Sequence, residues 1–300
     1  MAPDFIIVGA MKAGTSTLHA QLGSQPGIFM SSPKEPNYFS DDDQYQRGAS
    51  WYRSLFASAR SGDLCGESST HYTKLPTYPN TVERMIALLS EIKLVYIIRD
   101  PIERLVSHYI HAWTENWLHD PIDLAVETYS ELTDYSRYSM QLRPYLEAFG
   151  PENVKVVFFE RMIRQPEALL EEVARHIGYS GRVQWRAEVA RENVSKERLR
   201  KSVWRDAIVN APILSGIRRR LVPRSAREWA KGWWRMQRRP ELSTKTLARL
   251  RKVFDEDLAE LGRWGGISLS CETFAEAAHS TFSWGANVPV RGSGSQLAQS

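Results

Sequence analysis

The sequence DFIIVGAMKAGTSTLHAQL, residues 4–22, decides the fold that we expect for this chain. Its first five residues, 4–8, form an apolar run rich in β-branched side chains, which is typical of a buried strand. Gly9 and Gly14 permit a tight turn that brings the backbone close to a ligand. The hydroxyl residues after Gly14 are favourable at a helix N-terminus. The segment therefore predicts a strand, a short loop bounded by glycines, and a helix.

Lys12 lies within this loop, two residues before Gly14. Backbone N–H groups at a helix N-terminus, together with one ammonium group, form a site suited to phosphate. The spacing differs from that of a Walker A loop, in which the lysine follows the second glycine and the next hydroxyl binds Mg²⁺. The pattern therefore indicates a different phosphate-binding loop, with a plain turn and a solvated lysine as the alternative.

Further strand and helix signals alternate along the chain. Strands are expected at 63–67, 93–98 and 154–159, and helices at 51–56, 80–90, 101–109, 135–149, 166–177 and 243–264. We interpret 27–30 as a short link and 40–50 as a surface loop. Alternation of this kind predicts an α/β fold with a central parallel sheet flanked by helices. Ligands of such sheets bind at the carboxyl ends of the strands, so Lys12, Glu35 and Arg99 should meet at one edge.

The composition is that of a globular protein, with 42% hydrophobic and 25% charged residues among 300. Two cysteines, Cys65 and Cys271, provide neither a disulfide framework nor a metal cluster, which favours a reducing compartment. We see no signal peptide, and no apolar run approaches the roughly 18 residues of a membrane-spanning helix. We therefore expect a cytoplasmic protein with one domain over 1–284 and a disordered tail over 285–300.

The net charge of +4 conceals a strongly basic span. Residues 186–239 contain 16 Lys and Arg against 5 Asp and Glu, an excess of +11. We expect this tryptophan-rich span to form a helical basic C-terminal region. It could be a lid, a docking surface for an anionic partner, or a membrane-surface contact through 225–239. The ordinary alternative is that the tryptophans pack inward while the charges face water.

Three segments far apart in the chain together resemble the sulfotransferases that use 3′-phosphoadenosine 5′-phosphosulfate (PAPS). KAGTST at 12–17 is similar to their 5′-phosphosulfate loop, and RDPIERLVS at 99–107 is similar to their 3′-phosphate motif. KEPNYF at 34–39 is similar to the acidic segment of the heparan-sulfate-type branch, the N- and 3-O-sulfotransferases. The resemblance covers about residues 4–180 and implies a P-loop-like sheet and transfer of a sulfuryl group to an acceptor hydroxyl or amine.

The resemblance also implies a role for each matched residue. Glu35 is expected to remove the acceptor proton as general base, and Lys12 to stabilise charge on the leaving 5′-phosphate. Arg99 offers a bidentate fork to the 3′-phosphate, with Ser107 two helical turns further on. The predicted nucleotide-binding residues are Lys12, Ala13, Gly14, Thr15, Ser16, Thr17, Arg99 and Ser107. The ordinary alternatives are an Arg99–carboxylate ion pair and a surface pair between Lys34 and Glu35.

One segment departs from the family pattern. The glycosaminoglycan enzymes carry Glu-Lys-[Ser/Thr]-Pro-x-Tyr where this chain has ESSTHY at 67–72, so their lysine is Ser68 here. Because that lysine lies near the sulfuryl group in the family, a polyanionic sugar acceptor is placed in doubt. The residues expected to face the acceptor are Asn37, Tyr38, Glu67, Ser68 and His71. We interpret His108 and His111 as structural residues of a helix.

Two other functions are weighed against the sulfotransferase. A P-loop kinase or NTPase would explain the loop, although the Gly-Lys-Ser/Thr pairing and a clear Walker B carboxylate are missing. A nucleic-acid-binding protein would use the basic span, but we expect no nucleic-acid partner. The acceptor is expected to be a carbohydrate, a lipid or a small molecule, and no metal is expected. Residues 193–200 are the candidate loop over the nucleotide, and the oligomeric state is not predicted.

Overall fold

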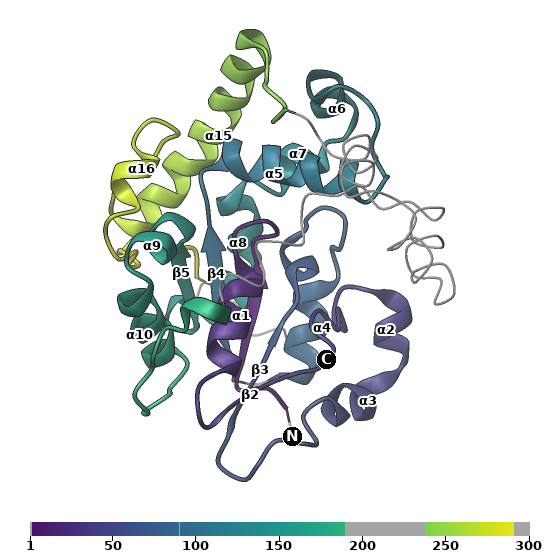
Figure 1. The fold of residues 1–300 in the computed structure, drawn as a ribbon, viewed down its shortest axis with the longest axis vertical. Helices are drawn as coiled ribbons and strands as arrows, with labels where there is room; N and C mark the ends of the chain where they lie inside the picture. The colour runs from purple at the N-terminus through teal and green to yellow at the C-terminus, as the bar shows by residue number, and fades with distance from the viewer. Residues whose placement is uncertain (1, 90, 190–237, 291–300) are drawn as a thin grey trace, which may run out of the picture.

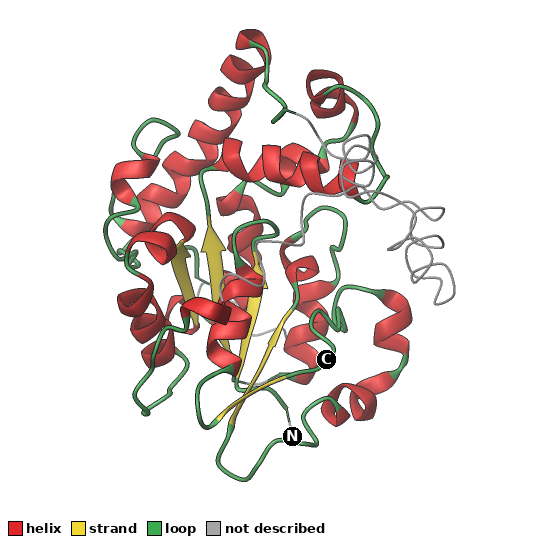
Figure 2. Cartoon of the chain, in the orientation of Figure 1, coloured by secondary structure: helices red, strands yellow, loops and turns green. Residues whose placement is uncertain are grey.

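The computed structural model describes residues 2–89, 91–189 and 238–290. Its centre is a five-stranded sheet in the order β2-β3-β1-β4-β5, and every neighbouring pair is parallel (Figure 2). The strands are β1 (Phe5–Gly9), β2 (Ile28–Met30), β3 (Leu64–Ser68), β4 (Lys93–Ile98) and β5 (Val154–Phe158). The predicted central parallel sheet is therefore confirmed.

Helices cover both faces of this sheet. Figure 1 shows α1 in front of the sheet and α8 behind it; α1 contacts α10, and α8 contacts α4 and α15. The helices are α1 (Thr15–Gly23), α2 (Asp42–Gln46), α3 (Gly48–Ser54), α4 (Thr81–Leu88), α5 (Pro101–Thr114), α6 (Ile122–Thr128), α7 (Glu131–Asp134), α8 (Tyr138–Phe149), α9 (Phe159–Arg164), α10 (Pro166–His176), α15 (Thr244–Gly265) and α16 (Phe274–Ala277), with 3₁₀ turns η1 (Thr70–Thr73) and η2 (Pro151–Asn153).

The central strands form the core. The side chains of Phe5, Ile6, Ile7 and Val8 in β1 have no exposed surface, and β4 is buried in the same way from Leu94 to Ile98. A strand covered by helices on both faces has no polar side. This is why both strands are continuous apolar runs and why the sequence signal for them was strong.

A second hydrophobic cluster lies at the carboxyl ends of the strands (Figure 1). It is formed by α5, α6, α7 and the N-terminal half of α15. Arg104 of α5 is fully buried there, and it donates hydrogen bonds to Ser136 Oγ and to the Leu132 carbonyl. These bonds hold the α7 segment against α5, beside the edge of the sheet where ligands bind.

Several local predictions differ from the structure. Residues 28–30, interpreted as a link, form the edge strand β2, and the supposed loop over 40–50 contains α2 and the start of α3. The short β2 pairs with β3, while the Asp41 carboxylate caps α2 by accepting the N–H of Asp43. Both elements are stabilised by contacts that a polar sequence pattern does not reveal.

The C-terminal predictions are tested only in part. The tail was expected to be disordered from Gly285, but the Gly285 N–H donates to the Trp264 carbonyl (2.6 Å), and Val288 packs against the core. Most of the basic span, including 193–200 and 225–237, lies outside the described residues. Every helix within the described part is too short or too polar to cross a membrane.

Candidate active site

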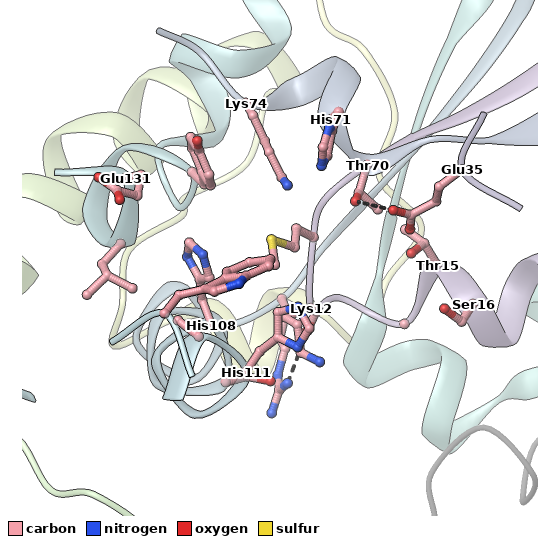
Figure 3. A pocket seen from close by; sticks show the side chains of 18 of the residues that line it. Lys12, Thr15, Ser16, Glu35, Thr70, His71, Lys74, His108, His111 and Glu131 are labelled. Atoms are coloured by element: carbon pink, nitrogen blue, oxygen red, sulfur yellow. Dashed lines mark hydrogen bonds between the residues drawn. The ribbon is translucent and has the colours of Figure 1, made fainter. Parts of the chain in front are cut away.

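A cavity of about 730 Å³ lies at the carboxyl ends of β1, β3 and β4 (Figure 3). It brings together nine residues predicted from the sequence: Lys12, Gly14, Thr15, Ser16, Thr17, Glu35, His71, Arg99 and Ser107. Unpredicted residues complete the lining: Met11, Thr70, Lys74, Tyr78, His108, His111, Ala112, Trp117, Leu118, Tyr129, Glu131, Leu132, Tyr135 and Phe159.

The loop between β1 and α1 is built around Gly14. This residue has a φ of 90°, and a Cβ added to it would lie 2.5 Å from Met162 Cε and 2.8 Å from the Phe159 ring. Glycine alone satisfies both the backbone conformation and the close packing. The Gly14 carbonyl accepts the N–H of Thr17 (3.0 Å), and α1 begins at Thr15.

The N-terminus of α1 forms the anion-binding end of the cavity. Gly14, Thr15 and Ser16 come before the first residue whose N–H can donate to a carbonyl one turn earlier in the helix, so their N–H groups have no acceptor within α1. They and the helix dipole therefore favour a phosphate at this end. The N–H of Ala13 donates to the Ala10 carbonyl (3.1 Å) and that of Thr17 to the Gly14 carbonyl, and the roles of both residues in nucleotide binding stay predictions.

Arg99 directly follows β4, and its guanidinium reaches the loop between β1 and α1. It donates a hydrogen bond to the Lys12 carbonyl (3.2 Å) and forms an ion pair with Glu103 one turn into α5 (3.3 Å). Glu103 is in turn paired with Arg239 (2.5 Å). Arg99 therefore lines the cavity and also forms an ion pair with a carboxylate, which was the alternative to phosphate binding. Ser107 lies about two helical turns after Arg99 and lines the same cavity.

Glu35 is fixed beside the end of β3. Its N–H donates to the Ser68 carbonyl (3.0 Å), and its backbone adopts a φ of 59°. One carboxylate oxygen pairs with the Lys34 ammonium (2.6 Å), and the other accepts from the Thr70 hydroxyl (3.4 Å, Figure 3). The carboxylate thus lines the cavity next to the N-terminus of α1, as predicted for a base beside the donor site.

The charges around Glu35 keep its carboxylate ionised. Burial is the largest single effect on the pKa of Glu35 and acts to raise it, but the charge and hydrogen bond of Lys34 and the charge of Lys74 together bring the pKa below its ordinary value. The carboxylate is therefore charged at neutral pH and able to accept a proton.

The sequence analysis did not identify Lys74 or His108 as residues of the cavity. Lys74 follows η1, and His108 and His111 belong to α5. We predicted that the two histidines are structural residues of this helix, but they also line the cavity. His108 stacks on Tyr135 with ring centroids 5.5 Å apart. No single sequence segment brings these residues together, which is why motif spacing did not reveal them.

The buried imidazoles are neutral at pH 7. Burial and then the Lys74 charge lower the pKa of His71 to about 4, and burial followed by the Arg104 charge lowers the pKa of His108 well below its ordinary value. His71 also stacks on Tyr78, with ring centroids 4.8 Å apart. Both histidines are therefore hydrogen-bonding groups rather than cations at this pH.

Two residues predicted to face the acceptor instead anchor the segment that carries Glu35. Tyr38 is buried and stacks on Tyr52 at 4.6 Å, inside an aromatic cluster, and it does not line the cavity. The N–H of Asn37 donates to Ser69 Oγ (3.1 Å), and Asn37 is also absent from the lining. The aromatic side chains of this segment pack into the core, so being close to Glu35 in sequence does not place them in the cavity.

Glu67 and Ser68 are also absent from the cavity lining. Both are fully buried in β3, where Ser68 contributes its carbonyl to Glu35 rather than its side chain to an acceptor. Burial raises the pKa of Glu67 to about 8, while nearby Tyr52 and Tyr72 act in the opposite direction. Glu67 is therefore a largely protonated core residue at neutral pH.

Within the described ranges, no three His, Cys, Asp or Glu side chains gather closely enough to ligate a metal ion. The predicted absence of a metal stays a prediction. The cavity does combine an anion-binding helix end, a lysine loop, an arginine and an ionised carboxylate. Such a set can bind a phosphorylated ligand and accept a proton from a second molecule beside it.

Comparisons with known proteins identify the family that the chain resembles. The family model described as "Sulfotransferase domain" matches residues 2–262. The chain is 34% identical over 130 residues to membrane-associated sulfotransferase kil1 of Dictyostelium discoideum, which covers 42% of this chain and 26% of that protein. It is 28% identical over 193 residues to heparan sulfate glucosamine 3-O-sulfotransferase 5 of Homo sapiens, covering 60% of this chain and 55% of that protein.

These matches span from a quarter to about half of the length of the curated relatives. Among solved structures, the sulfotransferase from Alicyclobacillus acidocaldarius superposes with a TM-score of 0.64 at 22% identity. That superposition covers 93% of this chain and all of the other, so the two chains share a fold.

Proposed function

The chain belongs to the sulfotransferase domain family, and from that membership we propose that it transfers a sulfuryl group from PAPS to an acceptor hydroxyl or amine. One observation carries this proposal. Lys12, Arg99 and Glu35, which come from three distant segments, line a single cavity. The family resemblance of the three motifs assigns these residues to the leaving phosphate, the 3′-phosphate and the acceptor proton.

The donor nucleotide fits the basic side of the cavity. Its 5′-phosphosulfate would lie at the N-terminus of α1, where the N–H groups of 14–16 and the Lys12 ammonium favour negative charge. Its 3′-phosphate would bind Arg99, with the Ser107 hydroxyl adding a hydrogen bond. Binding there requires the phosphate to compete with Glu103 for the Arg99 guanidinium.

The reaction is an in-line displacement at sulfur. The acceptor oxygen or nitrogen forms a bond to sulfur, while the bond between sulfur and the 5′-phosphate oxygen breaks and leaves its electron pair on the phosphate. Glu35 takes the acceptor proton, and Lys12 stabilises the charge that develops on the leaving phosphate. Positioning and electrostatic stabilisation carry most of the catalysis in a loose transition state of this kind.

We propose a chemical class for the acceptor rather than a single compound. Relatives named for heparan sulfate favour a carbohydrate, and a lipid or a small-molecule alcohol are the alternatives. The P-loop kinase alternative is not favoured by the family match. A cytoplasmic location and the lack of a nucleic-acid partner stay predictions, and a membrane contact through 225–239 rests largely on residues outside the described part.

The function is tested with ³⁵S-labelled PAPS and mixed hydroxyl acceptors, and Glu35→Gln tests the base. We expect this variant to bind 3′-phosphoadenosine 5′-phosphate (PAP) within about twofold of the wild type and to lose at least 10²-fold in transfer rate. The control Glu83→Gln changes an exposed carboxylate on α4 and should leave transfer unchanged. Transfer by Glu35→Gln at the wild-type rate would remove Glu35 from the role of base.

A further inference from the structure

The backbone on both sides of Lys74 is anchored by hydrogen bonds of its neighbours in the chain. Before it, the Thr73 hydroxyl donates to the Val8 carbonyl of β1 (2.7 Å). After it, the Leu75 N–H donates to Gln141 Oε1 (2.8 Å), and the Gln141 amide donates back to the Leu75 carbonyl (2.9 Å). The backbone on both sides of Lys74 is therefore fixed to the sheet and to α8. The lysine is a built part of the cavity wall.

The ammonium of Lys74 points into the cavity, between His71 and His108 (Figure 3). The residue is only 8% exposed, so its charge is largely removed from water. The ammonium lies over the Tyr135 ring, 5.8 Å from the ring centroid. The direct ion pair of Glu35 is made by Lys34 instead. Lys74 is thus a buried cation without a carboxylate within ion-pair distance among the described residues.

A buried ammonium without a paired anion is costly to keep. Burial lowers the pKa of Lys74 to about 8, against the opposing effect of Glu35, so most of the ammonium persists at pH 7. Glu35 offsets the cost of burying this charge only in part, and an anion bound in the cavity would offset it further. The sulfuryl group of the donor in the proposed function carries such anionic oxygens.

Resting on the proposed function, we propose that the Lys74 ammonium contacts the transferred sulfuryl group from the acceptor side and stabilises its charge during transfer. Lys12 acts on the leaving phosphate, and Lys74 acts on the group that moves. The β3–η1 segment has Ser68 where the family resemblance leads us to expect a lysine, and Lys74 supplies an ammonium to the cavity six residues later. Lys74 neither gives nor takes a proton in this role.

A purely structural lysine would behave differently. A cation held only by the Tyr135 ring would affect the free energy of unfolding but would not distinguish one nucleotide from another. A lysine that binds an anionic group of the acceptor would leave donor binding unchanged. Contact with the sulfuryl group predicts a selective effect on PAPS, because PAP lacks that group.

The test compares the affinities of PAPS and PAP, measured by titration calorimetry, and needs no acceptor. Lys74→Met is expected to weaken PAPS binding about tenfold and to leave PAP binding within twofold. Lys74→Arg, which keeps the charge, should retain most of the preference for PAPS. Lys93→Met is the matched control, because Lys93 is a half-buried lysine at the opposite end of β4. It should change neither affinity.

The pH dependence of nucleotide affinity provides a second test. For the wild type, the affinity for PAPS relative to PAP should fall as the pH rises above about 8, where the free Lys74 loses its proton. In Lys74→Arg this fall should be absent up to pH 9.5, because a guanidinium stays charged. Equal effects of Lys74→Met on the affinities for both nucleotides, or an effect on neither, would overturn the proposal for Lys74. The proposed function would still stand as long as the wild type binds PAP. Failure of the wild type to bind PAP would overturn both.

Discussion

At the scale of single residues, Glu67 carries a prediction about pH. Its pKa is raised to about 8 by burial in β3, against about 4.5 for an exposed glutamate. Between these values the native state keeps a proton that the unfolded state has lost. The stabilising contribution is therefore complete below pH 4.5 and is lost as the pH rises to about 8.

Glu67→Gln should remove this pH dependence while preserving the shape of the side chain. Relative to the wild type, the variant should become more stable as the pH rises from 5 to 8, by on the order of 3 kcal/mol at pH 8. Urea unfolding at several pH values measures the difference. A difference that does not change with pH would mean that Glu67 is ionised in the native protein.

At the scale of elements, the junction between β1 and α1 depends on Gly14, where a left-handed backbone meets the Phe159 and Met162 side chains. Gly14→Ala should cost about 3 kcal/mol, combining backbone strain with overpacking, and should weaken PAP binding because α1 shifts. Gly178→Ala is the matched control: Gly178 has a φ of 81° and nothing within 4 Å of an added Cβ.

The control should therefore cost only about 1 kcal/mol, from strain alone, with PAP binding unchanged. Thermal unfolding and calorimetry compare the two variants. If both lose the same stability and affinity, the packing against α9 has no part in shaping the loop.

At the scale of the whole molecule, nucleotide binding should raise the unfolding temperature. A ligand at one hundred times its Kd stabilises the native state by about 2.7 kcal/mol, which corresponds to roughly 5 °C for a chain of this size. Arg99→Ala should lose most of the shift caused by PAP and little of that caused by adenosine 5′-monophosphate, which lacks the 3′-phosphate. Equal losses for the two nucleotides would place the 3′-phosphate elsewhere. Differential scanning fluorimetry supplies both shifts.

The sequence predicted the parallel sheet well because β1 and β4 are apolar throughout, a pattern that requires cover on both faces. It also placed Lys12, Glu35 and Arg99 at one edge, because each follows an extended segment. It failed where the direction of a side chain depends on tertiary packing. Tyr38 and Glu67 each lie three residues from a cavity residue in sequence but are buried outside the cavity lining, whereas Lys74 lines the cavity on a segment that hydrogen bonds to Val8 and Gln141 hold in place.

The order of the strands has a consequence for evolution. β1 lies between β4, whose end supplies Arg99, and β3, whose following turn supplies Lys74. Arg99, which we propose to bind the 3′-phosphate, and Lys74, which we propose to contact the sulfuryl group, thus lie on opposite flanks of one shared strand. Under the proposed function, substitutions on the β3 flank other than at Lys74 can change the acceptor while the binding of the 3′-phosphate by Arg99 is kept.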